Sequence, residues 1–224
     1  MRWDGEKFVS LKLPNSKFIK AKNAEQRCAL DMLINPQITV CALLGLPGSG
    51  KTFLATQCGV YNVKERGHYS RILCLREPLS AADGRELGFL PGTLANKAEF
   101  TRIPFQQQFE GEEWEVDRMQ KQGLIDFNII AYIKGCTFNQ TYCVCDEAED
   151  LTKKQIKLIG TRIGENSKVV FDGDIKQSEI DTSDNNPLQL MCNELKTSPL
   201  FASITLSDDV RSETSKLFAN LFYE

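Results

Sequence analysis

The sequence has few of the residues from which metal and disulfide frameworks are built. It holds a single histidine, His68, and its eight cysteines include no C-x-x-C pair. A zinc site therefore lacks its usual ligand spacing. Most of the cysteines lie inside apolar stretches, where a thiol packs as a small hydrophobic group. We therefore expect reduced, mostly buried thiols, as in a cytosolic protein.

Long hydrophobic runs and a surplus of positive charge are also missing. No apolar stretch approaches the roughly 20 residues of a membrane span, and the start of the chain does not resemble a signal peptide. We therefore expect a cytoplasmic protein with no membrane partner. Because the formal net charge is −3, nucleic-acid binding would depend on a local basic patch. The length of 224 residues fits a single domain over 1–224.

Segments typical of strands alternate with segments typical of helices along the chain. We expect strands at residues 7–13, 38–44, 71–75, 125–130, 141–145, 169–171 and 202–206, and helices at residues 23–33 (capped by Asn23), 52–65, 152–163 and 212–222. This alternation predicts an α/β fold with a mostly parallel sheet and helices on both of its faces. Residues 78–123 are polar and rich in glycine, and we expect them to form an irregular insertion of loops and short helices above the active edge of the sheet.

One short motif carries the chemistry of phosphate binding. It follows the apolar strand at 38–44, opens the helix at 52–65, and matches G-x-x-x-x-G-K-[ST] with Gly45, Leu46, Pro47, Gly48, Ser49, Gly50, Lys51 and Thr52. The glycines let backbone N–H groups curl around a phosphate at the N-terminus of the helix. Lys51 can reach the β- and γ-phosphates, and the Thr52 hydroxyl can ligate Mg²⁺. A chance glycine-rich turn would not require these flanking elements.

A second motif ends the apolar strand at 141–145 in two acids, Asp146 and Glu147. In P-loop enzymes such a strand lies near the phosphate loop, and its first acid holds Mg²⁺ through water. Glu147 can then act as the general base that activates a water for attack on the γ-phosphate. This pair favours hydrolysis over phosphate transfer to a small molecule. The competing interpretation is that both acids are solvated charges at the start of the next helix.

Gln177 follows a further strand, at 169–171, and the turn Asp172-Gly173-Asp174. An amide at the tip of a strand next to the catalytic acid can hydrogen-bond the γ-phosphate or its attacking water. Taken alone, this pattern fits a surface glutamine as well as it fits a functional one.

These motifs belong to an ordered series along the chain. The series runs through Asn23–Gln26, the phosphate loop, Leu75–Pro78, Leu87–Gly92, Asp146–Glu149, Leu158–Gly164, Gly173–Gln177 and Asp208–Arg211. In this order they resemble the PhoH-like family, whose ATPase domain is related to superfamily-one helicases. The resemblance covers nearly all of the chain after about Lys20, and L-G-F-L-P-G and T-R-I-G are its most specific pieces. It implies a RecA-like P-loop NTPase fold with ATP and Mg²⁺ as ligands.

The resemblance also implies residue roles. Gln26 matches the glutamine that reads the adenine edge in related helicases, and Gln177 matches the glutamine of the G-D-x-x-Q motif. Arg211 matches an arginine that could stabilise transition-state charge. Arg76 and Arg162 are weaker candidates, for which structural ion pairs are an equal alternative.

The sequence departs from the family pattern in two ways. Where the family usually carries R-G-R-T, this chain has Lys134–Thr137, K-G-C-T, so a grip on RNA or on a neighbouring subunit would be altered. Some relatives also carry a fused nuclease domain, for which this chain has no room, and we expect no nuclease activity.

Three functions remain open at this stage. The first is an ATPase that acts on nucleic acid, most naturally RNA or another single strand, with Lys153, Lys154 and Lys157 as a basic helical face. The second is a metabolite kinase whose acceptor pocket and lid would lie in residues 78–123, with Arg85 and Arg102 as the arginines of the lid. The third is a nucleotide-dependent switch or scaffold, such as a GTPase. Because a lone RecA-like domain leaves the γ-phosphate open on one side, we expect a homo-oligomeric ring, as the family resemblance suggests a hexamer.

Overall fold

The computed structural model describes residues 1–3, 6–77, 101–109, 111–210, 213–214 and 217. Its centre is a six-stranded sheet in which every pair of neighbouring strands is parallel. In sheet order the strands are β5 (Ile125–Asn128), β4 (Arg71–Leu75), β6 (Thr141–Cys145), β7 (Lys168–Gly173), β3 (Val40–Gly45) and β8 (Phe201–Leu206). The expected parallel α/β sheet is therefore confirmed, and its arrangement is that of a RecA-like P-loop NTPase.

The order of the strands positions the functional site. After β3 the chain passes over the places of β7 and β6 to reach β4, while β8 pairs with β3 on its other side. In parallel α/β sheets, ligands bind beyond the carboxyl ends of the strands where the order reverses in this way. The phosphate loop after β3 and the acids after β6 therefore share one edge of the sheet, with β7 between them.

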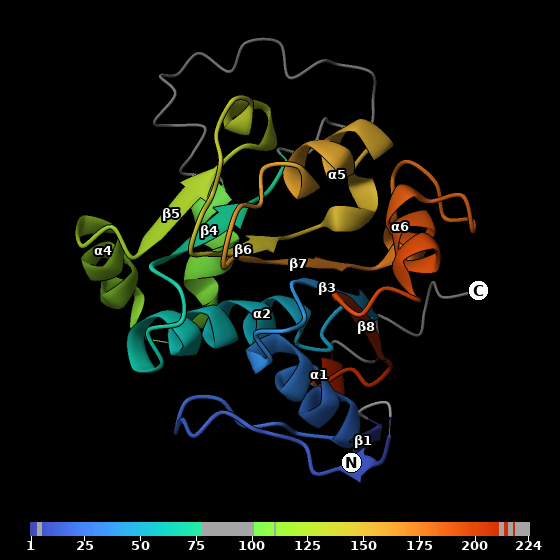
Figure 1. Cartoon of the computed structure of the whole chain (residues 1–224), viewed down its shortest axis with the longest axis horizontal. Helices are drawn as coiled ribbons and strands as arrows, with labels where there is room; N and C mark the ends of the chain where they lie inside the picture. The colour runs from blue at the N-terminus through green and yellow to red at the C-terminus, as the bar shows by residue number, and fades with distance from the viewer. Residues whose placement is uncertain (4–5, 78–100, 110, 211–212, 215–216, 218–224) are drawn as a thin grey trace.

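Two hydrophobic cores cover the two faces of the sheet, as the alternation of side chains along a strand requires. In β4, Ile72 and Cys74 belong to one core, whereas Leu73 and Leu75 belong to the other. Figure 1 shows α1 (Ala24–Ile34) and α2 (Lys51–Val60) on one side of the sheet and α5 (Lys153–Gly160) and α6 (Pro187–Leu195) on the opposite side.

Local capping fixes where several of these helices begin. The Asn23 side chain accepts a hydrogen bond from the Gln26 N–H and so caps α1, as expected. Thr152 and Gln155 form a reciprocal capping box at the start of α5. The helix α6 was not predicted, although Asn186 as cap and Pro187 at the first helical position are its sequence signals. A π-helix, Tyr61–Glu65, extends α2 to the expected end of that helical segment.

The described part of the segment 78–123 is more regular and more buried than we expected. Residues 101–106 are helical, a 3₁₀ turn spans Gln107–Phe109, and α4 spans Glu113–Lys121. The expected short helices are present in this part, but their burial was not expected, since four apolar side chains enter the core on the face of α1 and α2: Phe105, Phe109, Val116 and Met119. Residues 78–100 lie outside the described residues.

Other boundaries differ by a few residues. The first expected strand is reduced to β2 (Phe8–Val9), which pairs antiparallel with β1 (Arg2–Trp3). The strand β5 ends at Asn128, and a 3₁₀ turn, Ile130–Ile133, follows it. Most of the expected C-terminal helix lies outside the described residues.

All eight cysteines are free thiols, and six of them are buried. Within the described part of the chain, no helix has the length and hydrophobicity to cross a membrane.

Candidate functional site

The loop between β3 and α2 has the backbone conformation that the phosphate motif requires. Gly45, Gly48 and Gly50 have φ values of +133°, +77° and +88°, a region that favours glycine. A Cβ on Gly45 would lie 2.1 Å from the carbonyl oxygen of Leu206 in β8. Gly50 is the N-cap of α2 and has no side chain to cap it, which leaves the first-turn N–H groups of α2 for an anion.

Lys51 lies back over this loop. Its Nζ donates to the carbonyl oxygens of Gly45 (2.9 Å) and Leu46 (3.0 Å). The ammonium group is thus held at the rim of the cradle that the loop forms. A cation in this place, together with the N-terminus of a helix, suits a polyphosphate.

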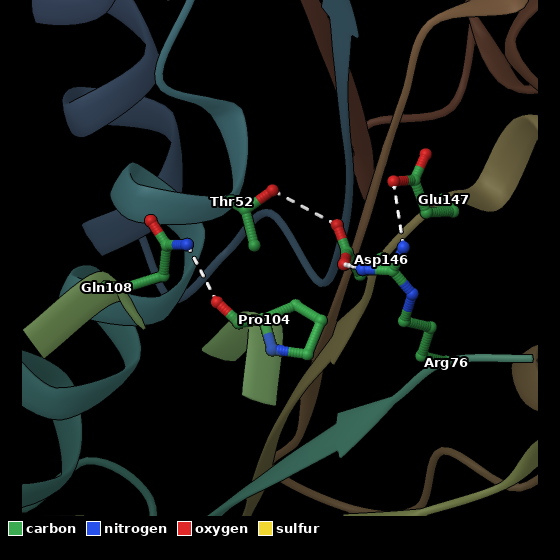
Figure 2. Close-up of polar contacts among 6 residues, drawn as sticks. All are labelled: Thr52, Arg76, Pro104, Gln108, Asp146 and Glu147. Carbon is green, nitrogen blue, oxygen red and sulfur yellow. Dashed lines mark hydrogen bonds and ion pairs between the residues drawn. The ribbon is translucent and has the colours of Figure 1, made fainter. Parts of the chain in front are cut away.

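Thr52 and Asp146 lie against each other, although they are 94 positions apart in the sequence. The Thr52 Oγ1 donates to Asp146 Oδ1 at 3.0 Å, as Figure 2 shows. Asp146 is buried, and its backbone N–H is bonded to the carbonyl oxygen of Leu75 in β4. A hydroxyl and a carboxylate are oxygen ligands of the kind that Mg²⁺ binds, so the pair fits the expected metal.

The described residues offer no larger metal cluster. No group of three or more His, Cys, Asp or Glu side chains that could hold a metal ion occurs among them. Mg²⁺ in nucleotide sites is usually held by one or two protein groups together with phosphate oxygens and water. The Thr52–Asp146 pair fits that pattern.

Glu147 has an unusual backbone conformation for a residue other than glycine. Its φ and ψ are 52° and 45°, in the left-handed region. Strain of this kind is found most often at functional sites. One Glu147 carboxylate oxygen lies 3.1 Å from Arg76 Nη2, and Arg76 Nη1 lies 2.6 Å from Asp146 (Figure 2). Arg76 was only a weak candidate from the sequence, and the structure shows it in contact with both acids.

Two further acids, for which sequence reasoning gave no role, lie behind this pair. Glu149 and Asp172 are almost completely buried. Burial raises the pKa of Glu149 to about 8. Burial, followed by the nearby Asp146 carboxylate, raises the pKa of Asp172 well above its ordinary range, while Lys51 acts in the opposite direction. The sequence signal that could have indicated them is their position: Glu149 follows the buried strand β6 closely, and Asp172 lies near the end of the buried strand β7.

A cavity of about 620 Å³ unites most of the predicted site residues. Those that line it are Gln26, Pro47, Gly48, Gly50, Lys51, Thr52, Asp146, Glu147 and Gln177. Gly45 and Ser49 shape the loop from behind, and Ser49 is buried. Gln108, from the 3₁₀ turn before α4, also lines the cavity, and its side chain donates to the Pro104 carbonyl (Figure 2). Arg211 lies outside the described residues.

Gln26 is placed differently from a free base-reading amide. Its Nε2 donates to the Ser49 carbonyl at 3.0 Å, and its Oε1 accepts from the Lys22 N–H at 2.8 Å. The side chain therefore braces the phosphate loop against the chain before α1. Phe18 and Lys20 line the same cavity.

Gln177 and Arg162 differ in their relation to the cavity. Gln177 ends a 3₁₀ turn, Ile175–Gln177, which follows the central strand β7, and it is exposed to the cavity. Arg162 instead donates to the carbonyl of Cys136 at 3.4 Å, in the stretch that replaces the family's arginine-rich segment.

Comparison with known proteins agrees with this geometry. The family described as PhoH-like protein matches residues 18–223 of the chain. The chain belongs to the PhoH-like family. This is a family of P-loop NTPases, and its match covers the phosphate loop, both acids after β6 and Gln177.

Several PhoH-like relatives are similar along most of the chain. Protein PhoH2 of Thermobispora bispora is 32% identical over 92% of this chain and 48% of its own length. Protein PhoH2 of Bacillus subtilis is 30% identical over 91% of this chain and 47% of its own length. A PhoH-like protein of Synechocystis is 31% identical over 85% of this chain and 57% of its own length. The chain thus spans about half the length of these relatives.

Proposed function

We propose that this PhoH-like protein binds ATP with Mg²⁺ and hydrolyses it to ADP and phosphate. The observation that carries the proposal is the position of Glu147 at the rim of the cavity that Lys51, Thr52 and Asp146 also line. A carboxylate next to the metal-binding acid can accept a proton from water. A kinase would instead need to exclude water from this place.

Each group has a distinct task in this proposal. The loop N–H groups and Lys51 bind the β- and γ-phosphates, and Thr52 and Asp146 hold the metal. Bound Mg²⁺ supplies neutralisation of the charge on the phosphate oxygens. Glu147 takes the proton of the attacking water. Gln177, at the end of the central strand, orients that water or the γ-phosphate.

Coupling of hydrolysis to single-stranded nucleic acid, RNA in particular, is the further part of the proposal. Lys153, Lys154 and Lys157 are exposed on α5 and form a local basic face on a protein whose net charge is negative. Such a patch could contact phosphates. Phosphate release measured with and without RNA and DNA oligonucleotides, at 50 and 200 mM salt, tests this part on its own.

The kinase alternative has less support from the described residues. Of the two arginines that could serve a lid, Arg102 forms an ion pair with Asp117 of α4, and Arg85 lies outside the described residues. Phosphate release in the absence of any acceptor separates hydrolysis from the kinase alternative. A GTPase switch would also release phosphate, so the comparison of release from ATP with release from GTP distinguishes it.

The test of the proposal compares two variants that fail for different reasons. Lys51→Ala removes the cation of the phosphate cradle, so phosphate release should be lost and nucleotide binding should be weakened. Glu147→Gln keeps the shape of the side chain but cannot accept a proton, so ATP and Mg²⁺ should still bind while phosphate release falls about 10²-fold or more. Phosphate release and the binding of a fluorescent nucleotide measure the two quantities separately. Undiminished release by Lys51→Ala would contradict the site, and equal loss of binding and turnover in Glu147→Gln would contradict its role as base.

A further inference from the structure

The two acids after β6 share one cationic partner, Arg76, which the neighbouring strand supplies. β4 and β6 are parallel, with Leu75 opposite Cys145, so the residue after each strand emerges at the same edge of the sheet. The hydrogen bond from the Asp146 N–H to the Leu75 carbonyl, 3.0 Å long, fixes this register. Arg76 is therefore placed beside Asp146 and Glu147 by the sheet itself.

The contacts of Arg76 use two separate nitrogens of its guanidinium group. Nη1 lies 2.6 Å from Asp146 Oδ2 and Nη2 lies 3.1 Å from Glu147 Oε1. Figure 2 shows the guanidinium group between the two carboxylates, with Thr52 on the far side of Asp146. A planar fork with fixed donor directions sets the relative orientation of the two acids in a way that a single ammonium group cannot.

The surroundings of the pair favour such a partner. Asp172 and Glu149 are buried close to Asp146 and Glu147, so four carboxyl groups gather at the ends of β6 and β7. The Glu147 side chain is 41% exposed and is attached to a strained left-handed backbone, so its carboxylate would have several orientations without a partner. The Arg76 side chain, in contrast, is only 20% exposed and provides a fixed point.

We propose that Arg76 is a positioning residue that holds the Glu147 carboxylate toward the attacking water while Asp146 holds the metal. This inference rests on the proposed hydrolysis. Arg76 acts through Glu147 and not through direct contact with the nucleotide. Its loss should therefore lower the rate of the chemical step and leave nucleotide binding nearly unchanged.

The experiment measures kcat and KM for MgATP in three variants. Arg76→Gln should lower kcat about 10- to 100-fold, since loss of orientation at a reacting group costs factors of this size, and should change KM less than about threefold. Arg76→Lys keeps the charge but can meet only one carboxylate well, so its kcat should fall between those of the wild type and Arg76→Gln. Arg71→Gln is the matched control, because Arg71 begins the same strand and contacts Thr141 and the Phe138 ring. Its kcat should equal that of the wild type.

A double-mutant cycle decides whether Arg76 acts through Glu147. In the Glu147→Gln background, single-turnover hydrolysis should show little further loss when Arg76→Gln is added. A full additional loss there, or a KM effect as large as the kcat effect, would overturn the inference, because Arg76 would then act on the nucleotide, on the metal or on the fold. Thermal melting of each variant separates loss of fold from loss of rate. A wild type without phosphate release would contradict the proposed function itself, whereas an active Arg76→Gln variant beside an inactive Glu147→Gln variant would contradict this inference alone.

Discussion

Carboxyl groups in and behind the candidate site differ in their exposure to water. Glu147 and Glu149 both line the cavity, but the Glu147 side chain is 41% exposed, whereas Glu149 is 2% exposed. Because burial disfavours the charged form, the pKa of Glu149 rises to about 8, which favours the protonated carboxyl in the folded protein. In the unfolded chain the same group ionises with its ordinary pKa. Folding stability must therefore depend on pH through this one residue.

The pH dependence has a definite sign. A carboxyl whose pKa is raised by folding contributes stability that is complete below its unfolded pKa and is lost as the pH rises through its folded pKa, here about 8. Between those two values the free energy of unfolding should fall by about 1.4 kcal/mol per pH unit. Glu149→Gln cannot ionise in either state, so its melting temperature relative to that of the wild type should rise steadily from about pH 5 to about pH 8.

Thermal unfolding of the nucleotide-free protein across this pH range measures the difference. The exposed Glu194 of α6 supplies the control, since Glu194→Gln should follow the wild type at every pH. Parallel curves for Glu149→Gln and the wild type would show that Glu149 is ionised in the folded protein.

Among the elements, the contact between α1 and β7 depends on one buried lysine. Lys168 begins β7 and is completely buried, and its Nζ donates to the carbonyl oxygens of Met32 (3.1 Å) and Asn35 (2.9 Å) at the end of α1. Burial lowers the pKa of Lys168. The last turn of α1 has no basic residue of its own, so the cation that favours a helix C-terminus comes from the sheet.

Replacement of this lysine should destabilise the protein. Lys168→Met keeps the chain length but leaves two interior carbonyl groups without their donor, which should lower the free energy of unfolding by about 2–4 kcal/mol. Urea denaturation followed by circular dichroism measures this loss. The same substitution at the exposed Lys153 of α5 should change the free energy by less than about 0.5 kcal/mol. Equal effects at both positions would show that the buried bonds contribute nothing.

At the scale of the whole molecule, the γ-phosphate side of the cavity can be closed by a group of the same subunit or of a neighbouring one. The Val210 N–H donates to the Gly48 carbonyl at 3.0 Å, so the chain passes the phosphate loop just before Arg211. We propose that the protein forms a ring, most simply a hexamer, in which Arg211, or failing that Arg162, serves the nucleotide of a neighbouring subunit. The alternative is a monomer whose Arg211 serves its own nucleotide.

Mixing two inactive variants separates these arrangements. Glu147→Gln subunits keep Arg211, and Arg211→Ala subunits keep Glu147, so mixed rings restore some complete sites. Random mixing in equal amounts should complete about a quarter of the interfaces, and phosphate release should rise to about that fraction of the wild-type rate. If no mixture exceeds its two components, the arginine acts within its own subunit. A monomer in light scattering at all concentrations with ATP present would exclude the ring.

The predictable part of the site came from patterns that are local in the sequence. The glycine spacing from Gly45 to Gly50 specifies a backbone, and an apolar strand before Asp146 specifies where that acid emerges. The burial of the segment containing α4 was not predicted, because its polar composition hides a helical spacing of apolar residues, such as Val116 and Met119. In such segments a few buried side chains outweigh the average composition.

The sequence by itself determined the α/β class, the glycine spacing of the phosphate loop, and the places of Thr52, Asp146 and Glu147 after their strands or at the start of their helix, because each depends on residues close together in the chain. Only the tertiary structure decided the order of the strands, which brings Arg76 from β4 to the acids after β6. It also decided that Glu149 is shielded from water and that Gln26 braces the phosphate loop. These properties depend on which strands become neighbours and which groups lose water, and both are settled by packing of the whole sheet.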